Sequence, residues 1–220
     1  MSTVLDIIGP VMIGPSSSHT AGAARLGLVA RKLLGEDATR AQVTLYGSFA
    51  KTYRGHGTDR ALAAGIMGMA TDDVRLRDAL DIARERGIDI AFVPSEDEAG
   101  HPNTAKLELA GTSGATLELI GSSVGGGAIC VTEIDGMKVN ITGQRETFIV
   151  LHRDVPGLIA AVTDVLAEGG ANICDFTLSR VSRGGDAVMS IEVEGHVDPL
   201  TNKRIRRLRD VTASIVLQPV

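Results

Sequence analysis

The sequence predicts an α+β protein of two domains, and three observations carry that prediction. Apolar residues recur with helical spacing in several segments, most clearly over residues 18–34 and 156–168. Other segments alternate apolar and polar residues between glycines, as strands of a small antiparallel sheet do. A short polar link at residues 142–146 (TGQRE) is followed by a segment that starts again with its own strand. We therefore expect domains over residues 1–143 and 147–220.

In the first domain, the first expected helix covers residues 18–34. Ser17 or Ser18 is its predicted N-cap and Gly35 its C-terminal stop. A strand over residues 41–49 follows, and then a glycine-flanked loop that holds His56 and leads into a second helix, with Thr58 or Asp59 as the cap. The remaining elements are a helix within residues 73–87, a strand at 88–95, and three alternating segments at 104–111, 115–123 and 127–141.

The second domain reads as β-α-β-β-α-β, which is ferredoxin-like topology. Pro156 fits the first position of its first helix, and a single apolar stripe runs to Gly169. The glycine turn at residue 157 would let backbone N–H groups approach a carboxylate, and Asn172 offers an amide to a ligand or to a neighbouring strand. The alternative, which the sequence leaves open, is that Gly157 and Asn172 serve only the turn and the helix cap.

Composition limits the partners that the chain can have. The net charge is −5 and spread without long blocks, which excludes a nucleic-acid partner, because phosphate backbones need clustered Lys and Arg. No run reaches the roughly 18 apolar residues of a membrane span, and the N-terminus lacks the positive region of a signal peptide. We expect a cytoplasmic protein with no membrane partner. Its two cysteines, Cys130 and Cys174, cannot by themselves hold a metal cluster.

The stretch GPSSSHTAG places many hydrogen-bonding groups at the start of the first helix. A helix N-terminus has unsatisfied N–H groups and a partial positive charge, so this run suits a small anion such as a carboxylate. The candidate binding residues are Ser16, Ser17, Ser18, His19 and Thr20. The plainer alternative for His19, and for His56 in the loop, is a surface or capping histidine.

Two other kinds of site are disfavoured. A Ser-His hydrolase would need a G-x-S-x-G elbow, which is absent, and sequence adjacency of Ser18 and His19 does not place the hydroxyl on the imidazole. The stretch GSSVGGG at residues 121–127 lacks the Lys and the following Ser or Thr of a phosphate-binding P-loop, so a hairpin turn or a flexible contact loop is favoured there.

Two resemblances to known families rest on these motifs. The run D-x-P-G-L from Asp154, followed by Asn172, resembles the ACT domain, a regulatory module that often binds an amino acid between copies. GPSSSHTAG, LYGSFAKTYRGHGTDRALAAGIMG and GSSVGGG, together with the ACT-like end, resemble the β chain of the two-chain, iron–sulfur-dependent L-serine dehydratase. For residues 1–143 this implies a fold like the allosteric substrate-binding domain of some phosphoglycerate dehydrogenases.

The resemblance also implies an activity and its parts. L-serine would be converted to pyruvate and ammonia without pyridoxal phosphate, using a [4Fe-4S] cluster ligated by a partner α chain. Some relatives need a monovalent cation, and the sequence leaves that requirement open, as it does homodimerisation through the ACT domains and their ligand. The alternative function is a non-catalytic subunit that senses an amino acid.

Dehydration of serine needs a base for the Cα proton, and the glycines beside His56 suit close approach of a substrate. We therefore expect His56 to be the base and Thr58 its orienting partner. His19 and the preceding serines would hold the substrate carboxylate. The reverse assignment of the two histidines stays open at this point.

Overall fold

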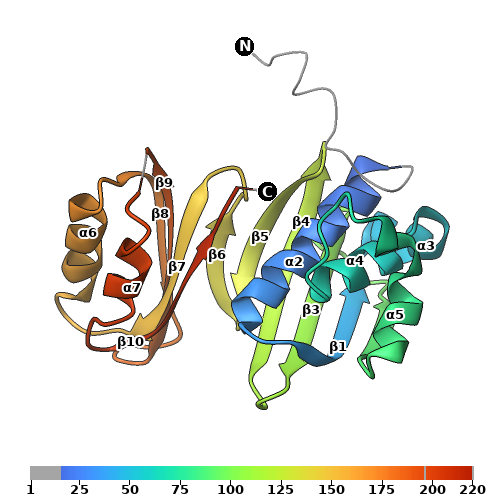
Figure 1. The fold of residues 1–220 in the computed structure, drawn as a ribbon, viewed down its shortest axis with the longest axis horizontal. Coiled ribbons are helices and arrows are strands. Elements are labelled where there is room, and N and C mark those ends of the chain that lie inside the picture. The colour runs from blue at the N-terminus through green and yellow to red at the C-terminus, as the bar shows by residue number, and fades with distance from the viewer. Residues whose placement is uncertain (1–15, 196, 220) are drawn as a thin grey trace, which may run out of the picture. The chain divides into compact units, whose positions relative to one another are not determined.

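The computed structural model describes residues 16–195 and 197–219 of the chain (Figure 1). It divides into two compact units, Met1–Asp135 and Gly136–Val220. The division falls in a turn ahead of β6 (Met137–Ile141), and β6 packs against β8 (Asn172–Arg180) and β9 (Asp186–Glu194) within the second unit. This position lies before the polar link at which the sequence predicts the boundary.

The sheet of the first unit contains the predicted antiparallel pairs and, in addition, one parallel pair, so it is mixed. Its strands are ordered β2-β1-β3-β4-β5, and β2 pairs with β1 in parallel. The connection between β1 and β2 contains four helical segments, long enough for the crossover that parallel strands require. The strands are β1 (Ala38–Leu45), β2 (Asp89–Pro94), β3 (Thr104–Gly111), β4 (Thr116–Gly125) and β5 (Ala128–Ile134).

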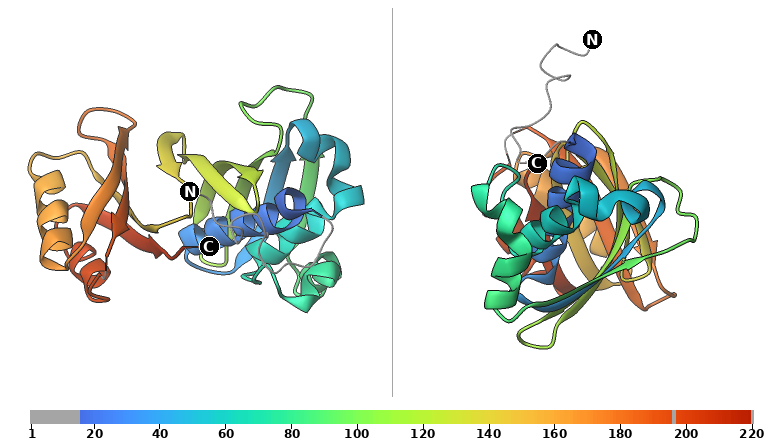
Figure 2. Two further views of the ribbon diagram at one scale, coloured as in Figure 1. Left: turned by 90° about the horizontal axis from the view of Figure 1, so that it is seen from above. Right: turned by 90° about the vertical axis from the view of Figure 1, so that its right-hand side faces the viewer.

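Helices cover one face of this sheet (Figures 1 and 2). The helical segments are η1 (Ser17–Gly22), α2 (Ala23–Leu34), α3 (Gly47–His56), α4 (Thr58–Ile66), η2 (Val74–Asp78) and α5 (Ala79–Glu85). A side chain at Gly27 of α2 or at Gly65 of α4 would meet the backbone of the other helix. The two helices therefore approach closely through small residues, and the predicted helix pair is confirmed. Gly35 ends α2 in the left-handed conformation, as predicted.

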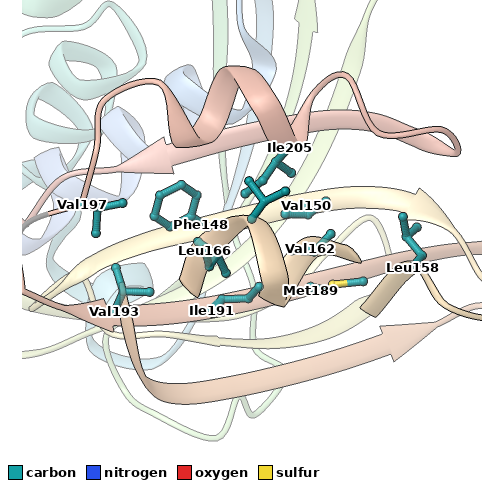
Figure 3. Close-up of a cluster of buried hydrophobic side chains, with 11 residues drawn as sticks. Phe148, Val150, Leu158, Val162, Leu166, Met189, Ile191, Val193, Val197 and Ile205 are labelled. Carbon is teal, nitrogen blue, oxygen red and sulfur yellow. The ribbon is translucent and has the colours of Figure 1, made fainter. Parts of the chain in front are cut away.

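The second unit has the predicted β-α-β-β-α-β order. Its strands form an antiparallel sheet in the order β10-β7-β9-β8, the ferredoxin-like arrangement, with both helices on one face (Figure 2). The remaining elements are β7 (Glu146–Arg153), α6 (Leu158–Glu168), α7 (Thr201–Ile205) and β10 (Val211–Leu217). Aliphatic side chains and Phe148 fill the space between α6, α7 and the sheet (Figure 3).

Helix α6 begins later than the sequence suggests. Gly157 is its N-cap, with a φ of 87°, and Leu158 is its first residue. Pro156 therefore lies in the preceding turn and does not take the first helical position. Among the residues described, no helix is long and apolar enough to cross a membrane.

Candidate active site

The N-terminal motif starts a helix, but Ser16 caps it rather than Ser17 or Ser18. Ser16 has an extended backbone, and its hydroxyl accepts a hydrogen bond from the His19 backbone N–H at 3.3 Å. The backbone carbonyl of Ser16 accepts from the Thr20 N–H at 2.8 Å. The predicted cap is one or two residues late because η1 already begins at Ser17, before the regular apolar spacing appears. Ser17 and Ser18 are half-buried in the first turn.

His19 uses both of its ring nitrogens within this chain. Its Nδ1 lies 3.2 Å from the Ser16 hydroxyl, and its Nε2 lies 3.2 Å from the hydroxyl of Ser48 in α3. The ring of Phe49 packs edge-on against the imidazole, with centroids 5.3 Å apart. Burial, and then the neighbouring charge of His56, lower the pKa of His19. The ring is therefore neutral and fixed near pH 7.

His56 is the last residue of α3, whereas the sequence suggests a loop at this position. Gly57 follows with a φ of 72° and ends the helix in the left-handed conformation. Gly55 suggests a loop in the sequence, but it lies inside the helix, and no atom comes within 4 Å of the position that its side chain would occupy. The exposed imidazole of His56 lies 4.7 Å from that of His19, measured between ring centroids. The two predicted site histidines are thus brought together.

Thr58 does not have the predicted roles. It is fully buried at the start of α4, and no hydrogen bond joins its hydroxyl to His56 or to any other described residue. Neither Thr58 nor Asp59 caps α4 through its side chain, because Gly57 takes the N-cap position. Asp59 is also buried, which raises the pKa of its carboxyl, and its Oδ1 accepts from the Arg60 backbone N–H at 2.8 Å.

Thr20 differs from the rest of the predicted carboxylate grip because its side chain is closed off from solvent. Its hydroxyl is buried and has no hydrogen-bond partner among the described residues. The same is true of the hydroxyl of Ser123 in β4. Gly22 lies directly against Ser123, and a side chain at Gly22 would overlap that hydroxyl. The glycine that ends the motif therefore lets the first helix pack on β4.

Ser48 is the site residue that sequence reasoning missed. It is the second residue of α3, and its contact with His19 joins positions 29 residues apart in the sequence. The signal that could have found it is a helix assignment for residues 47–56, because Ser48 and His56 are then two turns apart on the same helix. The candidate site thus consists of Ser16, His19, Ser48 and His56.

Comparison with known proteins identifies the family. Residues 3–86 match the family model described as "Serine dehydratase beta chain". The chain is 47% identical over 196 residues to the probable L-serine dehydratase β chain of Bacillus subtilis, covering 89% of each chain. It is 32% identical to the L-serine dehydratase β chain of Peptoniphilus asaccharolyticus, covering 90% of this chain and 89% of that one. The chain belongs to the L-serine dehydratase β-chain family.

More distant similarities involve other proteins. The D-3-phosphoglycerate dehydrogenase of Synechocystis is 26% identical over 84% of this chain and 33% of its own length. Among solved structures, the ACT domain of GTP pyrophosphokinase from Chlorobium tepidum matches 33% of this chain and 95% of its own, with 16% identity and a TM-score of 0.28.

In this member of the β-chain family, Gly157 and Asn172 are not brought together. They lie at the two ends of α6, whose 11 residues span about 16 Å. Asp154, the first residue of the D-x-P-G motif, is held by Arg180 at 2.6 Å and by the Gly184 N–H at 3.1 Å.

The described residues of this β-chain family member do not fit an iron–sulfur cluster. They contain no group of three or more His, Cys, Asp or Glu side chains that could hold a metal. Cys130 is in β5 of the first unit and Cys174 is in β8 of the second. Neither cysteine has a second cysteine near it in its own unit within the described ranges, so they form no thiolate set.

Proposed function

We propose that this chain is the β subunit of an L-serine dehydratase that converts L-serine to pyruvate and ammonia together with an α chain. The observation that carries the proposal is the His19–His56 pair in a member of this family. Serine loses its Cα proton and its hydroxyl group as water, and the enamine tautomerises to an imine. Hydrolysis of the imine takes up one water and releases ammonia and pyruvate.

His56 is the base in this proposal. A base must reach the Cα proton and must have a free nitrogen lone pair. The ring of His56 is exposed and makes no hydrogen bond to a described residue, whereas both nitrogens of His19 are engaged. The hydrogen bonds thus favour the assignment that the sequence left open. Proton transfer of this kind contributes about 10²–10⁴-fold to a rate.

The leaving hydroxide needs an electrophile, and the part of the chain that the structure describes offers no cluster of metal ligands. Hydroxide is a poor leaving group, and no three His, Cys, Asp or Glu side chains of the described residues are grouped to hold a metal ion that could assist its departure. We propose that the α chain carries a [4Fe-4S] cluster, which supplies a Lewis acid for the hydroxyl oxygen, and that pyridoxal phosphate is not used. A requirement for a monovalent cation stays a prediction.

Reconstitution tests the proposal. The β chain and its α partner are purified anaerobically, and pyruvate is assayed after adding L-serine to each chain and to the mixture. We expect pyruvate only when both chains are present, because the β chain supplies the base and the α chain supplies the electrophile. Turnover by the β chain alone, or an inactive mixture whose cluster absorbance is intact, would refute the proposal.

Pairing of two copies through the C-terminal unit is a separate proposal. Strand β8 is the last strand of its sheet, and Ile173 and Leu178 on it are 36% exposed. An edge strand with exposed apolar side chains is a ready surface for a second chain. We expect Ile173→Lys to lower the mass measured by analytical ultracentrifugation. An unchanged mass would contradict pairing through this edge.

A further inference from the structure

We propose that Ser48 supplies the hydroxyl that binds the substrate carboxylate, and that Ser16 and His19 orient it through a chain of hydrogen bonds. The inference rests on the proposed function and assigns a binding role to a residue outside the predicted carboxylate grip. It follows from which atom donates and which accepts in the hydrogen bonds between Ser16, His19 and Ser48.

In this proposal the chain of hydrogen bonds begins with the Ser16 hydroxyl as the donor to His19. The Ser16 hydroxyl oxygen accepts from the His19 backbone N–H at 3.3 Å, so its own hydrogen is available to the His19 Nδ1 at 3.2 Å. A neutral imidazole carries one proton, and an Nδ1 that accepts leaves that proton on Nε2. Burial of His19 favours the neutral ring, in agreement with its lowered pKa.

As a result, the proton of the Ser48 hydroxyl is not used in the hydrogen bond with His19. With its proton on Nε2, His19 donates to the Ser48 oxygen at 3.2 Å. The Ser48 hydroxyl makes no other hydrogen bond to a described residue, so its own hydrogen is available to an outside acceptor. The chain thus ends in one oriented O–H donor.

The start of α3 is held in place by contacts with Pro102. The N–H groups of Ser48 and Phe49 both donate to the Pro102 carbonyl, at 2.6 and 3.3 Å. Gly47 has a φ of 54° and lies so close to Pro102 that a side chain would collide with its backbone. The amides of Ser48 and Phe49 are therefore not available to a ligand, whereas the Ser48 hydroxyl is.

The position of Ser48 fits the carboxylate of serine. The His19 ring contacts both the Ser48 hydroxyl and the His56 ring, so a ligand next to His19 can meet both. Serine has one fully charged acceptor, its carboxylate, and hydrogen bonds to charged acceptors are the stronger kind. Ser16 and His19, in contrast, use their donors on each other and on Ser48.

Kinetics of three variants in the reconstituted α/β pair test the inference. Ser48→Ala removes the donor, Ser48→Thr keeps a hydroxyl, and Thr52→Ala is the matched control, since Thr52 donates only to the Ser48 carbonyl on the same helix. We expect Ser48→Ala to raise the KM for L-serine at least about 10-fold with kcat changed much less. Ser48→Thr should restore most of the affinity, and Thr52→Ala should leave KM unchanged.

Two results would overturn the inference. One is a KM for Ser48→Ala equal to that of Thr52→Ala in a pair whose wild-type form is active. The other needs no turnover: ¹⁵N NMR of the β chain alone should show His19 protonated at Nε2, and protonation at Nδ1 contradicts the chain of hydrogen bonds. An inactive wild-type pair refutes the proposed function instead, and the NMR result still decides the orientation.

Discussion

Two histidine-bearing segments, residues 16–22 and 47–58, look alike in the sequence and differ in the structure. Each places a histidine among glycines and hydroxyl residues ahead of a small-residue helix. In the first, His19 sits in the opening turn of a helix with both ring nitrogens engaged. In the second, His56 ends a helix and its ring is exposed. The comparison teaches that hydrogen-bond partners, more than local sequence, separate a histidine that positions from one that transfers protons.

The largest expected effect is the loss of kcat on replacing His56. In the reconstituted pair, His56→Ala should lower kcat about 10²–10⁴-fold, because the substrate proton then has no base. Pyruvate formation and cluster absorbance are measured on the same sample, so that loss of the cluster is recognised. A full kcat with only a changed affinity for serine would favour the alternative of a non-catalytic amino-acid sensor.

A second prediction concerns the packing beneath His19. Gly22→Ala places a methyl group on the Ser123 side chain and should destabilise the protein by about 1–3 kcal/mol in urea unfolding. The double variant with Ser123→Ala should recover part of this loss, since the hydroxyl oxygen is the nearest atom. Equal stability of the single variant and the wild type would show that η1 does not pack closely on β4.

Gly55→Ala tests whether the segment that carries His56 is a helix. Gly55 lies within α3, and nothing approaches its side-chain position within 4 Å. We expect alanine to stabilise the protein by up to about 1 kcal/mol, because Ala is the better helix former. Clear destabilisation in the same urea assay would favour the glycine-flanked loop over the helix.

The smallest expected effect is a change in the pKa of His19. His56→Ala removes the second of the two causes that lower it, so the pKa should rise, while burial keeps it below the ordinary value of 6.5. An NMR titration of the His19 ring protons measures this change. A pKa unaffected by the substitution would mean that the two rings do not interact electrostatically.

The same shift has a consequence for stability. With a folded-state pKa below 6.5, the unfolded chain takes up the proton first as the pH falls. The contribution of His19 to stability is therefore complete above about pH 6.5 and is lost as the pH falls toward the folded-state pKa. Urea unfolding at a series of pH values, with His19→Gln as the reference, should show this loss in the wild type alone.

Regular elements were predictable, since their signals are periodic. Helix α2, the strands of the first sheet and the β-α-β-β-α-β order all follow from apolar spacing and glycine turns. Of the two alternatives left open for residues 121–127, a hairpin turn and a flexible contact loop, the structure has the hairpin. Such patterns indicate which face of a helix or strand is buried, and the burial of apolar side chains is the main force that stabilises the fold.

Parts of the site were not predictable, because tertiary contacts decide them. Residues 47–49 were expected to end a strand, and Gly55 and Gly57 to flank a loop, yet a helix runs over Gly47–His56. Its first turn is fixed by contacts with Pro102, which lies far away in the sequence. The role expected of Thr58 fails because its side chain is buried beneath the helix start. The contact between Ser48 and His19 leaves no local signal, since the two residues lie on distant segments.

The measurement that tests the account most directly is the comparison of His56→Gln with His19→Gln in the reconstituted pair. Glutamine can donate and accept hydrogen bonds but cannot take up a proton near neutral pH. We expect His19→Gln to retain kcat within about 10-fold and His56→Gln to lose at least about 10²-fold. The opposite order, with His19→Gln the more damaging for kcat, would contradict the division of roles between the two histidines.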